Sequence, residues 1–352
     1  MKQILSVLFL SCLIISAKSQ DKRISLLFTG DAMQHMPQVH AAWNGHEYDY
    51  NNCFYLIKDK VTQADIACVN LETTLGGKPY TGYPMFSSPD AFALALKQTG
   101  FNLFFLANNH MLDRGKKGVE RTIQQLNNFD IKHTGIFSNA HERNLDYPAL
   151  LTVKGVRIAF LNYTTNTNGL QPQYPNIINL ADTVEMKRDL IHTHMLNPDI
   201  IIANMHWGEE YITRPTTHQK ELADFLIRNG VRIIIGHHPH VIQPMVKHIS
   251  DNKINSVVYY SLGNFVSNQQ KTNTDGGAIA EITLRVSKDH EIEIESAQYS
   301  FVWVRKYRSE GKFNYTIIPT DMDLREINPP LSPEETQKMS IFVNNAKRII
   351  SP

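Results

Sequence analysis

The chain has 352 residues, of which 42% are hydrophobic and 20% are charged, and its formal net charge is +1 at pH 7. This length supports a large buried core, and we expect one large α/β domain with a β-rich C-terminal part. The nearly balanced charge provides no basic surface field, so nucleic acid is excluded as the expected partner.

Residues 1–19 have the features of a secretory signal peptide. Lys2 precedes an apolar stretch from Ile4 to Ile15, and Ala17-Lys-Ser19 places small residues where a signal peptidase cleaves. A transmembrane anchor is the alternative, but the apolar run is broken by polar residues and is shorter than the ~20 residues that span a bilayer. We therefore expect cleavage before Gln20, export to the periplasm or the cell exterior, and no transmembrane anchor afterwards.

Cleavage would leave 33 basic and 34 acidic residues, and two of the three cysteines. Cys53 and Cys68 could form one disulfide in an exported protein. Cys68, however, lies inside an apolar run and is typical of a small buried side chain. Neither cysteine has a CxxC partner, so we expect neither to bind metal.

Five apolar segments predict strands that end in polar side chains. They begin at Ile24, Ile66, Leu103, Ile200 and Val231, and they end in Gly30-Asp31, Asn70-Leu-Glu72, Asn108-Asn-His110, His206-Trp-Gly-Glu-Glu210 and Gly236-His-His-Pro-His240. Strands that alternate with helices and end in functional side chains indicate an α/β sheet whose site lies at the carboxyl ends of the strands. We predict that the five ends converge on one site.

Helical periodicity separates these strands. It predicts helices over residues 53–63, 90–99, 115–129, 182–195 and 217–229, while 33–52 shows no clear period. A hairpin is expected at Lys154-Gly155. Beyond residue 256 the pattern favours strands, with a hairpin of 278–286 and 291–300, and a terminal helix over 332–349.

The string His237-His238-Pro239-His240 is the strongest metal-binding signal. Side chains alternate faces on an extended segment, so His238 and His240 would point the same way and His237 the other way. The string alone could be a polar turn. Together with the other four strand ends, it predicts a metal site.

The candidate ligands combine oxygen and nitrogen donors: Asp31, Glu72, Asn109, His206, His238 and His240. Such a mixed set suits Zn, Mn, Fe or Mg-type divalent ions better than calcium, which prefers oxygen alone. Six ligands exceed what one tetrahedral ion needs. Two ions that share a bridging carboxylate would use them all.

Six strings in this order resemble the CapA family of poly-γ-glutamate capsule biosynthesis proteins, which is related to the calcineurin-like metallophosphoesterases. The strings are Gly30-Asp-Ala-Met33, Asn70-Leu-Glu-Thr-Thr-Leu75, the segment 107–115, His206-Trp-Gly-Glu-Glu-Tyr211, the segment 236–243 and Tyr260-Ser-Leu-Gly-Asn-Phe265. The resemblance covers about residues 24 to 270. It implies a four-layer α/β/β/α sandwich with a cleft at the strand ends. We divide the chain into a signal peptide (1–19), a CapA-like core (20–270) and a β-rich extension (271–352) that completes the sandwich and ends in a helix.

The resemblance also assigns roles to the candidate residues. It places Asp31 on a first ion, Glu72 between both ions, Asn109 and His206 on the second, and His238 and His240 on one ion each. His110 matches the residue that assists the departing oxygen, and Asp113 would orient it. A histidine that is adjacent to a ligand but off the ligand face suits a general acid.

Two positions depart from the phosphoesterase pattern. Asp31-Ala-Met33 stands where those enzymes have Asp-x-His, and a thioether is a poor ligand for a hard ion. Glu72 stands where they have a bridging aspartate. We therefore expect the first metal position to be weaker than the second.

The expected function is that of an exported, metal-dependent hydrolase that uses activated water on a phosphoester or an amide. The resemblance implies an anionic polymer such as poly-γ-glutamate, a cell-envelope glycan or a small molecule as substrate. A peptidase or amidase differs from a phosphoesterase only in the bond cut. The alternative of another class is a non-catalytic polymer-binding or capsule-assembly module with a structural or vestigial metal site, which Met33 supports.

Overall fold

The computed structural model describes residues 21–269, 271–309 and 311–350. The predicted signal peptide, residues 1–19, lies outside the described residues. Within the described part of the chain, no helix is both long and apolar enough to cross a bilayer.

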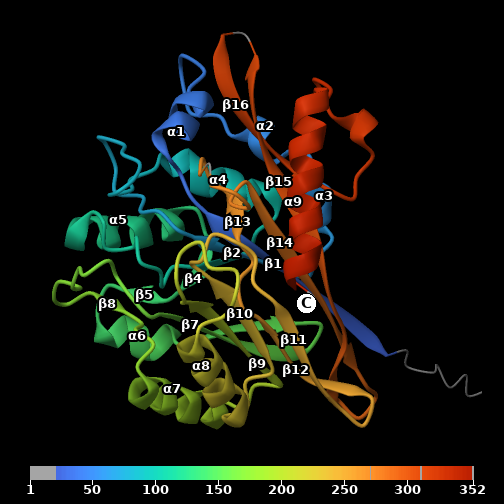
Figure 1. Ribbon diagram of the computed structural model, residues 1–352. Helices are drawn as coiled ribbons and strands as arrows, with labels where there is room; N and C mark the ends of the chain where they lie inside the picture. The colour runs from blue at the N-terminus through green and yellow to red at the C-terminus, as the bar shows by residue number, and fades with distance from the viewer. Residues whose placement is uncertain (1–20, 270, 310, 351–352) are drawn as a thin grey trace, which may run out of the picture.

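Most of the strands form one continuous path of hydrogen-bonded neighbours in the order β4-β3-β2-β1-β14-β15-β12-β10-β9-β7-β6 (Figure 1). The first half of this path contains β1 (Lys22–Ala32), β2 (Ile66–Leu71), β3 (Leu103–Phe105), β4 (Lys132–Thr134) and β14 (Gly276–Val286). The second half contains β6 (Ala149–Val153), β7 (Val156–Thr164), β9 (Ile200–His206), β10 (Ile233–His237) and β12 (Lys253–Tyr259). The long strand β15 (Ile292–Ser309) joins the halves, because it pairs along β14 and also meets β12 where Ile294 faces Ile254.

Three apolar clusters show that the sheet halves and the helices form four layers. The central cluster lies between the halves and contains Phe28 of β1 and Ile235 of β10. One outer cluster packs the other face of β1, through Leu27, against α4 (Asp90–Thr99) and α5 (Gly115–Asn128). The other packs β7 and β9 against α7 (Thr183–Met195) and α8 (Thr217–Arg228). Both faces of these strands are buried, which explains their continuous apolar runs and confirms the predicted α/β/β/α sandwich.

The long helices agree with their predicted ranges to within one residue. The prediction was wrong where helices are short. In place of one helix over 53–63 the chain has α2 (Asn51–Phe54), which begins before that range, and α3 (Lys58–Thr62), and the region 33–52 contains α1 (Met36–Ala42). Helices of four to seven residues complete at most two turns, so no period of 3.6 residues emerges from them. Short elements also include α6 (Ala140–Asp146), η1 (Leu324–Glu326), β5 (Ile136–Phe137) and β8 (Ile177–Ile178).

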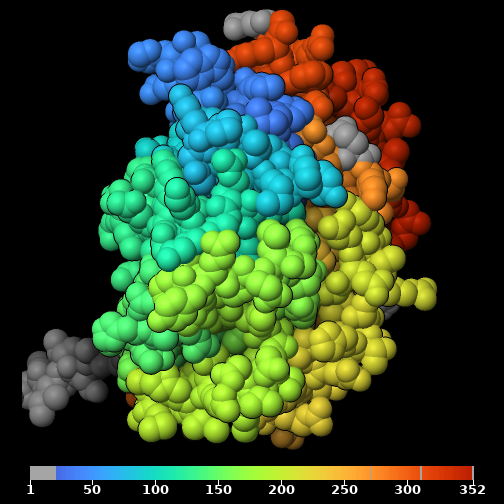
Figure 2. All heavy atoms as spheres, turned by 90° about the vertical axis from the view of Figure 1, so that its left-hand side faces the viewer, coloured from blue at the N-terminus to red at the C-terminus, as the bar shows by residue number. Residues whose placement is uncertain are grey.

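The C-terminal part contributes strands to the middle of the sheet, because β14 lies directly beside β1. The predicted hairpin is present, but β15 continues to Ser309 and returns as β16 (Lys312–Pro319), which the sequence pattern did not predict. In Figures 1 and 2 the blue segment of α1 and α2 lies beside the orange segment of β16, where the Thr316 hydroxyl donates to the carbonyl of Asn52. Helix α9 (Pro333–Ile350) closes the chain, and β11 (Met245–Ser250) and β13 (Asn264–Val266) are side branches of the sheet.

The segment 260–263 runs between the ends of β1 and β10. A Cβ atom on Gly30 would lie 2.0 Å from the carbonyl oxygen of Gly263, and one on Gly236 would lie 2.0 Å from that of Tyr260. The two glycines directly precede Asp31 and His237. Because both lie close to the segment 260–263, the ends of β1 and β10 pack against the same segment. Cys53 and Cys68 are buried and free, as expected.

Candidate metal centre

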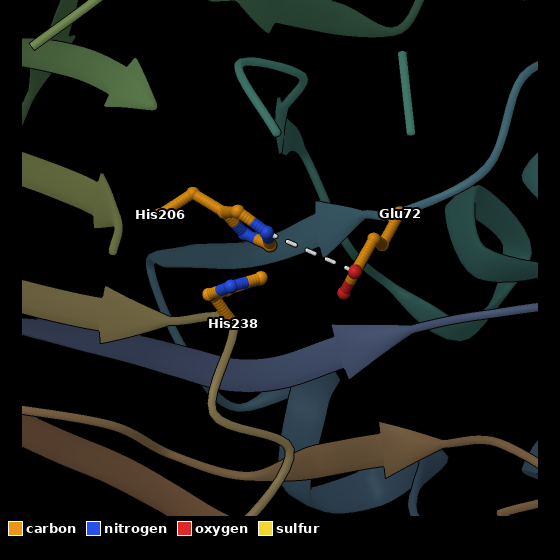
Figure 3. A group of neighbouring side chains, drawn as sticks. All are labelled: Glu72, His206 and His238. Carbon is orange, nitrogen blue, oxygen red and sulfur yellow. Dashed lines mark ion pairs between the residues drawn. The ribbon is translucent and has the colours of Figure 1, made fainter. Parts of the chain in front are cut away.

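Two overlapping groups of buried side chains lie at the carboxyl ends of the strands. Glu72, His206 and His238 form one group, and Asp31, Glu72 and His240 form the other, with the ligand atoms of each group within 4.8 Å of one another. Figure 3 shows the first group, in which the rings of His206 and His238 lie beside the Glu72 carboxylate. Glu72 belongs to both groups, which is the position that a bridging ligand would take.

Parallel pairing brings these residues together. Asp31, one residue before the end of β1, pairs with Asn70 of β2, so Glu72 follows two residues beyond that pair. His206 ends β9 and pairs with His237, the last residue of β10. Carboxyl ends of parallel strands meet at one edge of a sheet, so the side chains from both halves face a common site.

The His-Pro-His segment reaches the site by a turn rather than by strand alternation. His238 and His240 have φ angles of 96° and 57°, so the backbone leaves the extended conformation immediately after β10. The expectation that His237 points away from the site was wrong. Its Nδ1 lies 3.2 Å from Asp31 Oδ1, and its Nε2 lies 2.7 Å from Asn204 Oδ1. His237 therefore bridges Asp31 and Asn204, as an outer partner that orients a metal ligand does.

The environment of Glu72 is the strongest sign that the site takes a cation. The side chain is fully buried, and neither carboxylate oxygen has a hydrogen-bond partner among the described residues. Its Oε1 lies 3.8 Å from Nε2 of both His206 and His240. Burial, together with the charge of Asp31, raises the pKa of Glu72 well above its usual range. An unpaired buried carboxylate is costly, and a divalent ion would balance it, so the residues present fit such an ion.

The surroundings of Asp31, His206 and His238 hold these three side chains in their metal-binding forms. Burial raises the pKa of Asp31, but the contacts with His237 and His240 outweigh this effect and hold it well below the usual range. Burial lowers the pKa of His238 to about 4 and that of His206 well below its usual value. A carboxylate and neutral imidazoles are the protonation states that ligate metals.

Amide side chains complete the surroundings of both groups. Asn109, a predicted ligand, lies with Oδ1 2.9 Å from Nε2 of His206, on the side of the group formed by Glu72, His206 and His238. Asn70 Nδ2 donates to Asp31 Oδ1 over 2.8 Å, and Asn264 Oδ1 lies 3.2 Å from Nδ1 of His240. Asn70 and Asn264 were not among the predicted site residues, although both lie within the sequence motifs. The position of Asn70 two residues before Glu72, on the same strand face, was the available signal.

His110 and Asp113 form the predicted contact next to the metal groups. His110 Nδ1 lies 2.8 Å from Asp113 Oδ2, which also accepts from the backbone N–H of Phe86 over 2.7 Å. The Phe86 ring packs edge-on against the imidazole, with centroids 4.6 Å apart. Because Asp113 occupies Nδ1, Nε2 is the ring nitrogen that can serve a substrate, as a general acid requires.

Comparison with known protein sequences identifies relatives of this chain. Residues 25–269 match the family described as bacterial capsule synthesis protein PGA_cap. Capsule biosynthesis protein CapA of Bacillus anthracis is 34% identical over 205 residues, which cover 56% of this chain and 48% of that protein. PGA biosynthesis protein CapA of Bacillus subtilis is 31% identical over 211 residues, covering 56% and 51%. The chain thus spans about half the length of these curated relatives.

Solved structures show the same fold at low sequence identity. A protein described as a 5'-nucleotidase of Staphylococcus aureus superposes with a TM-score of 0.53 and 13% identity, covering 92% of this chain and 58% of that one. The NAD nucleotidase NadN of Haemophilus influenzae gives 0.50 and 13%, covering 94% and 68%. Both have the calcineurin-like metallophosphoesterase fold. The chain belongs to the CapA family of bacterial capsule synthesis proteins, and it carries that family's sequence on this fold.

Proposed function

We propose that the protein is an exported, divalent-metal-dependent hydrolase of capsule or poly-γ-glutamate metabolism. The observation that carries this proposal is Glu72, a fully buried carboxylate that has no hydrogen-bond partner among the described residues and that belongs both to the group with His206 and His238 and to the group with Asp31 and His240. Hydrogen-bonded packing alone does not account for such a group. A pair of bound cations would balance the charge of this carboxylate and would account for it.

Each residue has a defined task in the proposed reaction. Asp31 and His240 would hold a first ion, His206, His238 and Asn109 a second, and Glu72 both. A divalent ion bound there lowers the pKa of a water molecule toward neutrality and polarises the bond that is cut. His110 would give a proton from Nε2 to the leaving atom, while Asp113 holds the ring through Nδ1.

The proposed substrate is an anionic polymer, or a small fragment of one, with a phosphoester or an amide at the cleaved bond. The names of the relatives support a capsule polymer such as poly-γ-glutamate, and the fold supports a phosphoester. A positively charged lysine side chain at the edge of the site supports a negative charge on either type of substrate. Lys271 Nζ lies 3.5 Å from the centroid of the Tyr211 ring, which in turn lies 6.1 Å from the ring of His240.

Metal content and a substrate panel test the proposal together. The protein is stripped with a chelator, reloaded with Mn²⁺ or Zn²⁺, and assayed on phosphodiesters and on γ-glutamyl amides. We expect metal-dependent turnover of one class, and loss of that turnover in Glu72→Gln together with loss of bound metal. Tight metal binding without turnover of either class would contradict the hydrolase.

The second candidate is a non-catalytic module that binds a capsule polymer. It is favoured by Met33, which is buried at the position where related phosphoesterases place an imidazole ligand. This candidate predicts that poly-γ-glutamate or an envelope glycan binds equally well to the metal-loaded protein and to its His110→Ala variant. It also predicts no metal-dependent turnover in the substrate panel, so the panel and this binding measurement together separate the two candidates.

A further inference from the structure

His35, which is not one of the predicted ligands, lies beside the site. It follows β1 and directly precedes α1. Its ring packs edge-on against Phe86, with centroids 5.2 Å apart and an interplanar angle of 85°. Phe86 packs edge-on against His110 as well, with centroids 4.6 Å apart. One phenyl ring therefore holds two imidazoles, and one of them is the proposed general acid.

The ring of His35 is anchored through one nitrogen only. The backbone N–H of Asn268 donates to Nδ1 over 3.3 Å. A backbone N–H can only donate, so Nδ1 is an acceptor and the neutral ring carries its hydrogen on Nε2. Across residues 21–269, 271–309 and 311–350, no group accepts a hydrogen bond from that Nε2. The donor is therefore not used by the fold.

The protonation state of His35 suits a donor that works at neutral pH. Burial lowers the pKa of His35 to about 4 and outweighs the Gln38 side chain, which raises it, while the nearby imidazoles of His240 and His110 oppose a charge on the ring. A ring with this pKa is neutral at physiological pH and donates from Nε2 without first taking up a proton. The Phe86 ring, which packs against the imidazoles of His35 and His110, places the His35 ring next to the general acid.

We propose that His35 is a substrate-binding residue whose Nε2–H donates to a non-leaving oxygen of the group that is cut, a phosphoryl or a carbonyl oxygen. His110 serves the leaving atom, and Phe86 fixes the separation of the two rings. The segment in which Met33 replaces a histidine thus provides an imidazole two residues later, for the substrate rather than for the metal. This inference rests on the proposed function.

A pair of substitutions separates substrate binding from a structural role. His35→Gln keeps an N–H donor near the position of Nε2 and removes the acceptor for Asn268. His35→Asn keeps an acceptor near Nδ1 and removes the donor. Inorganic phosphate is the probe, and calorimetry of the Mn²⁺-loaded protein gives its Kd together with the metal content. The control is His40→Asn, which changes an exposed histidine on α1.

We expect His35→Asn to weaken phosphate binding by ~10–100-fold, the effect of one lost hydrogen bond to an anion. His35→Gln should stay within a few-fold of wild type, and all variants should hold as much metal as wild type. The reverse order, with His35→Asn normal and His35→Gln weakened, would assign His35 a purely structural role and overturn the inference. Wild-type protein that takes up no metal would overturn the proposed function, and this inference with it. Normal metal content with unchanged phosphate affinity in both variants would overturn the inference alone.

Discussion

At the scale of single residues, the centre combines opposite pKa shifts in two neighbouring carboxyl groups. Asp31 has an imidazole nitrogen 3.2 Å from each oxygen, while the imidazole nitrogens nearest to Glu72 lie 3.8 Å away, so the pKa of the first is lowered and it is ionised, and the pKa of the second is raised and favours its neutral form. Binding a cation requires Glu72 to lose its proton. Metal uptake is therefore coupled to proton release, and metal affinity should rise with pH.

The first prediction concerns this coupling in the metal-free protein. Without an ion, the folded state keeps a proton on Glu72 at pH values where the unfolded chain, with a pKa of about 4.3, has lost it. Stability from this group is therefore lost as pH rises. Glu72→Gln cannot ionise, so its free energy of unfolding in chelator should gain on wild type by up to about 1.4 kcal/mol for each pH unit. Urea unfolding between about pH 5 and pH 8 measures the difference, and a difference independent of pH would contradict the assignment.

The second prediction concerns His110. His110→Ala should leave folding and metal content nearly intact and lower any hydrolytic rate by ~10²–10⁴-fold, the usual effect of losing a general acid. Turnover and metal content are measured on the same preparation. His192→Ala, at an exposed position on α7, is the control. Unchanged turnover would remove His110 from the mechanism.

The third prediction concerns the two metal positions. The position of His206, His238 and Asn109 should fill first, because the position of Asp31 and His240 lacks the imidazole that Met33 replaces. Titration of chelator-stripped protein should show two separate steps. His206→Ala should abolish the tighter step, and Met33→His should strengthen the weaker one. Two equal steps in wild type would show that the first position is wrongly assigned.

At the scale of elements, the site depends on the segment 260–263 that runs between the ends of β1 and β10. Gly30 and Gly236 leave room for its carbonyl groups, and the backbone N–H of Asp31 donates to the carbonyl of Gly263 over 2.9 Å. Asn264, directly after this segment, contacts His240. The motif at residues 260–265 therefore supports the ligands without supplying a carboxylate or an imidazole.

The fourth prediction tests this support. In Gly30→Ala, the new Cβ atom would lie 2.0 Å from Gly263 O, so the two backbones must separate. We expect a loss of about 1–3 kcal/mol in the free energy of unfolding, together with weaker metal binding. Gly169→Ala is the control, because its Cβ has open space and only its φ of 77° is unfavourable, a cost of about 1 kcal/mol. Equal metal affinity in both variants would contradict the supporting role.

At the scale of the whole molecule, the sandwich is assembled from both ends of the described chain. Residues 280–286 of β14 pair with residues 22–28 of β1, and Arg305 of β15 is buried in an ion pair with Glu335 of α9. Strand β1 therefore lies in the centre of the fold, and a leader peptide that precedes it must leave it free to pair with β2 and β14.

The fifth prediction follows from this position. We propose that the exported protein begins at Gln20, directly before the first described residue, Asp21. Removal of residues 1–19 should leave the sheet intact. Mass analysis of the N-terminus in secreted or periplasmic material measures this directly. Retention of residues 1–19 on the exported protein, or its absence outside the cytoplasm, would contradict the proposal.

The sequence by itself determined the fold class, the family and the candidate ligands. Apolar runs that end in Asp31, Glu72, His206 and His238 carry this information locally, because parallel strands must place their carboxyl ends at one edge. The ranges of α4 and α8 could also be predicted from the local sequence, because ten or more residues establish a helical period.

The tertiary structure alone decided how these residues face one another. His237 contacts Asp31 because the chain turns with positive φ after β10, and strand alternation holds only within the strand. Asn70, Asn264 and His35 acquired partners through contacts between distant segments, which no periodicity encodes. The sheet is continuous because β15 reaches both halves, and its extension into β16 depends on packing against α1 and α2. Local pattern specifies which side chains reach a strand end, and only long-range packing specifies what they meet there.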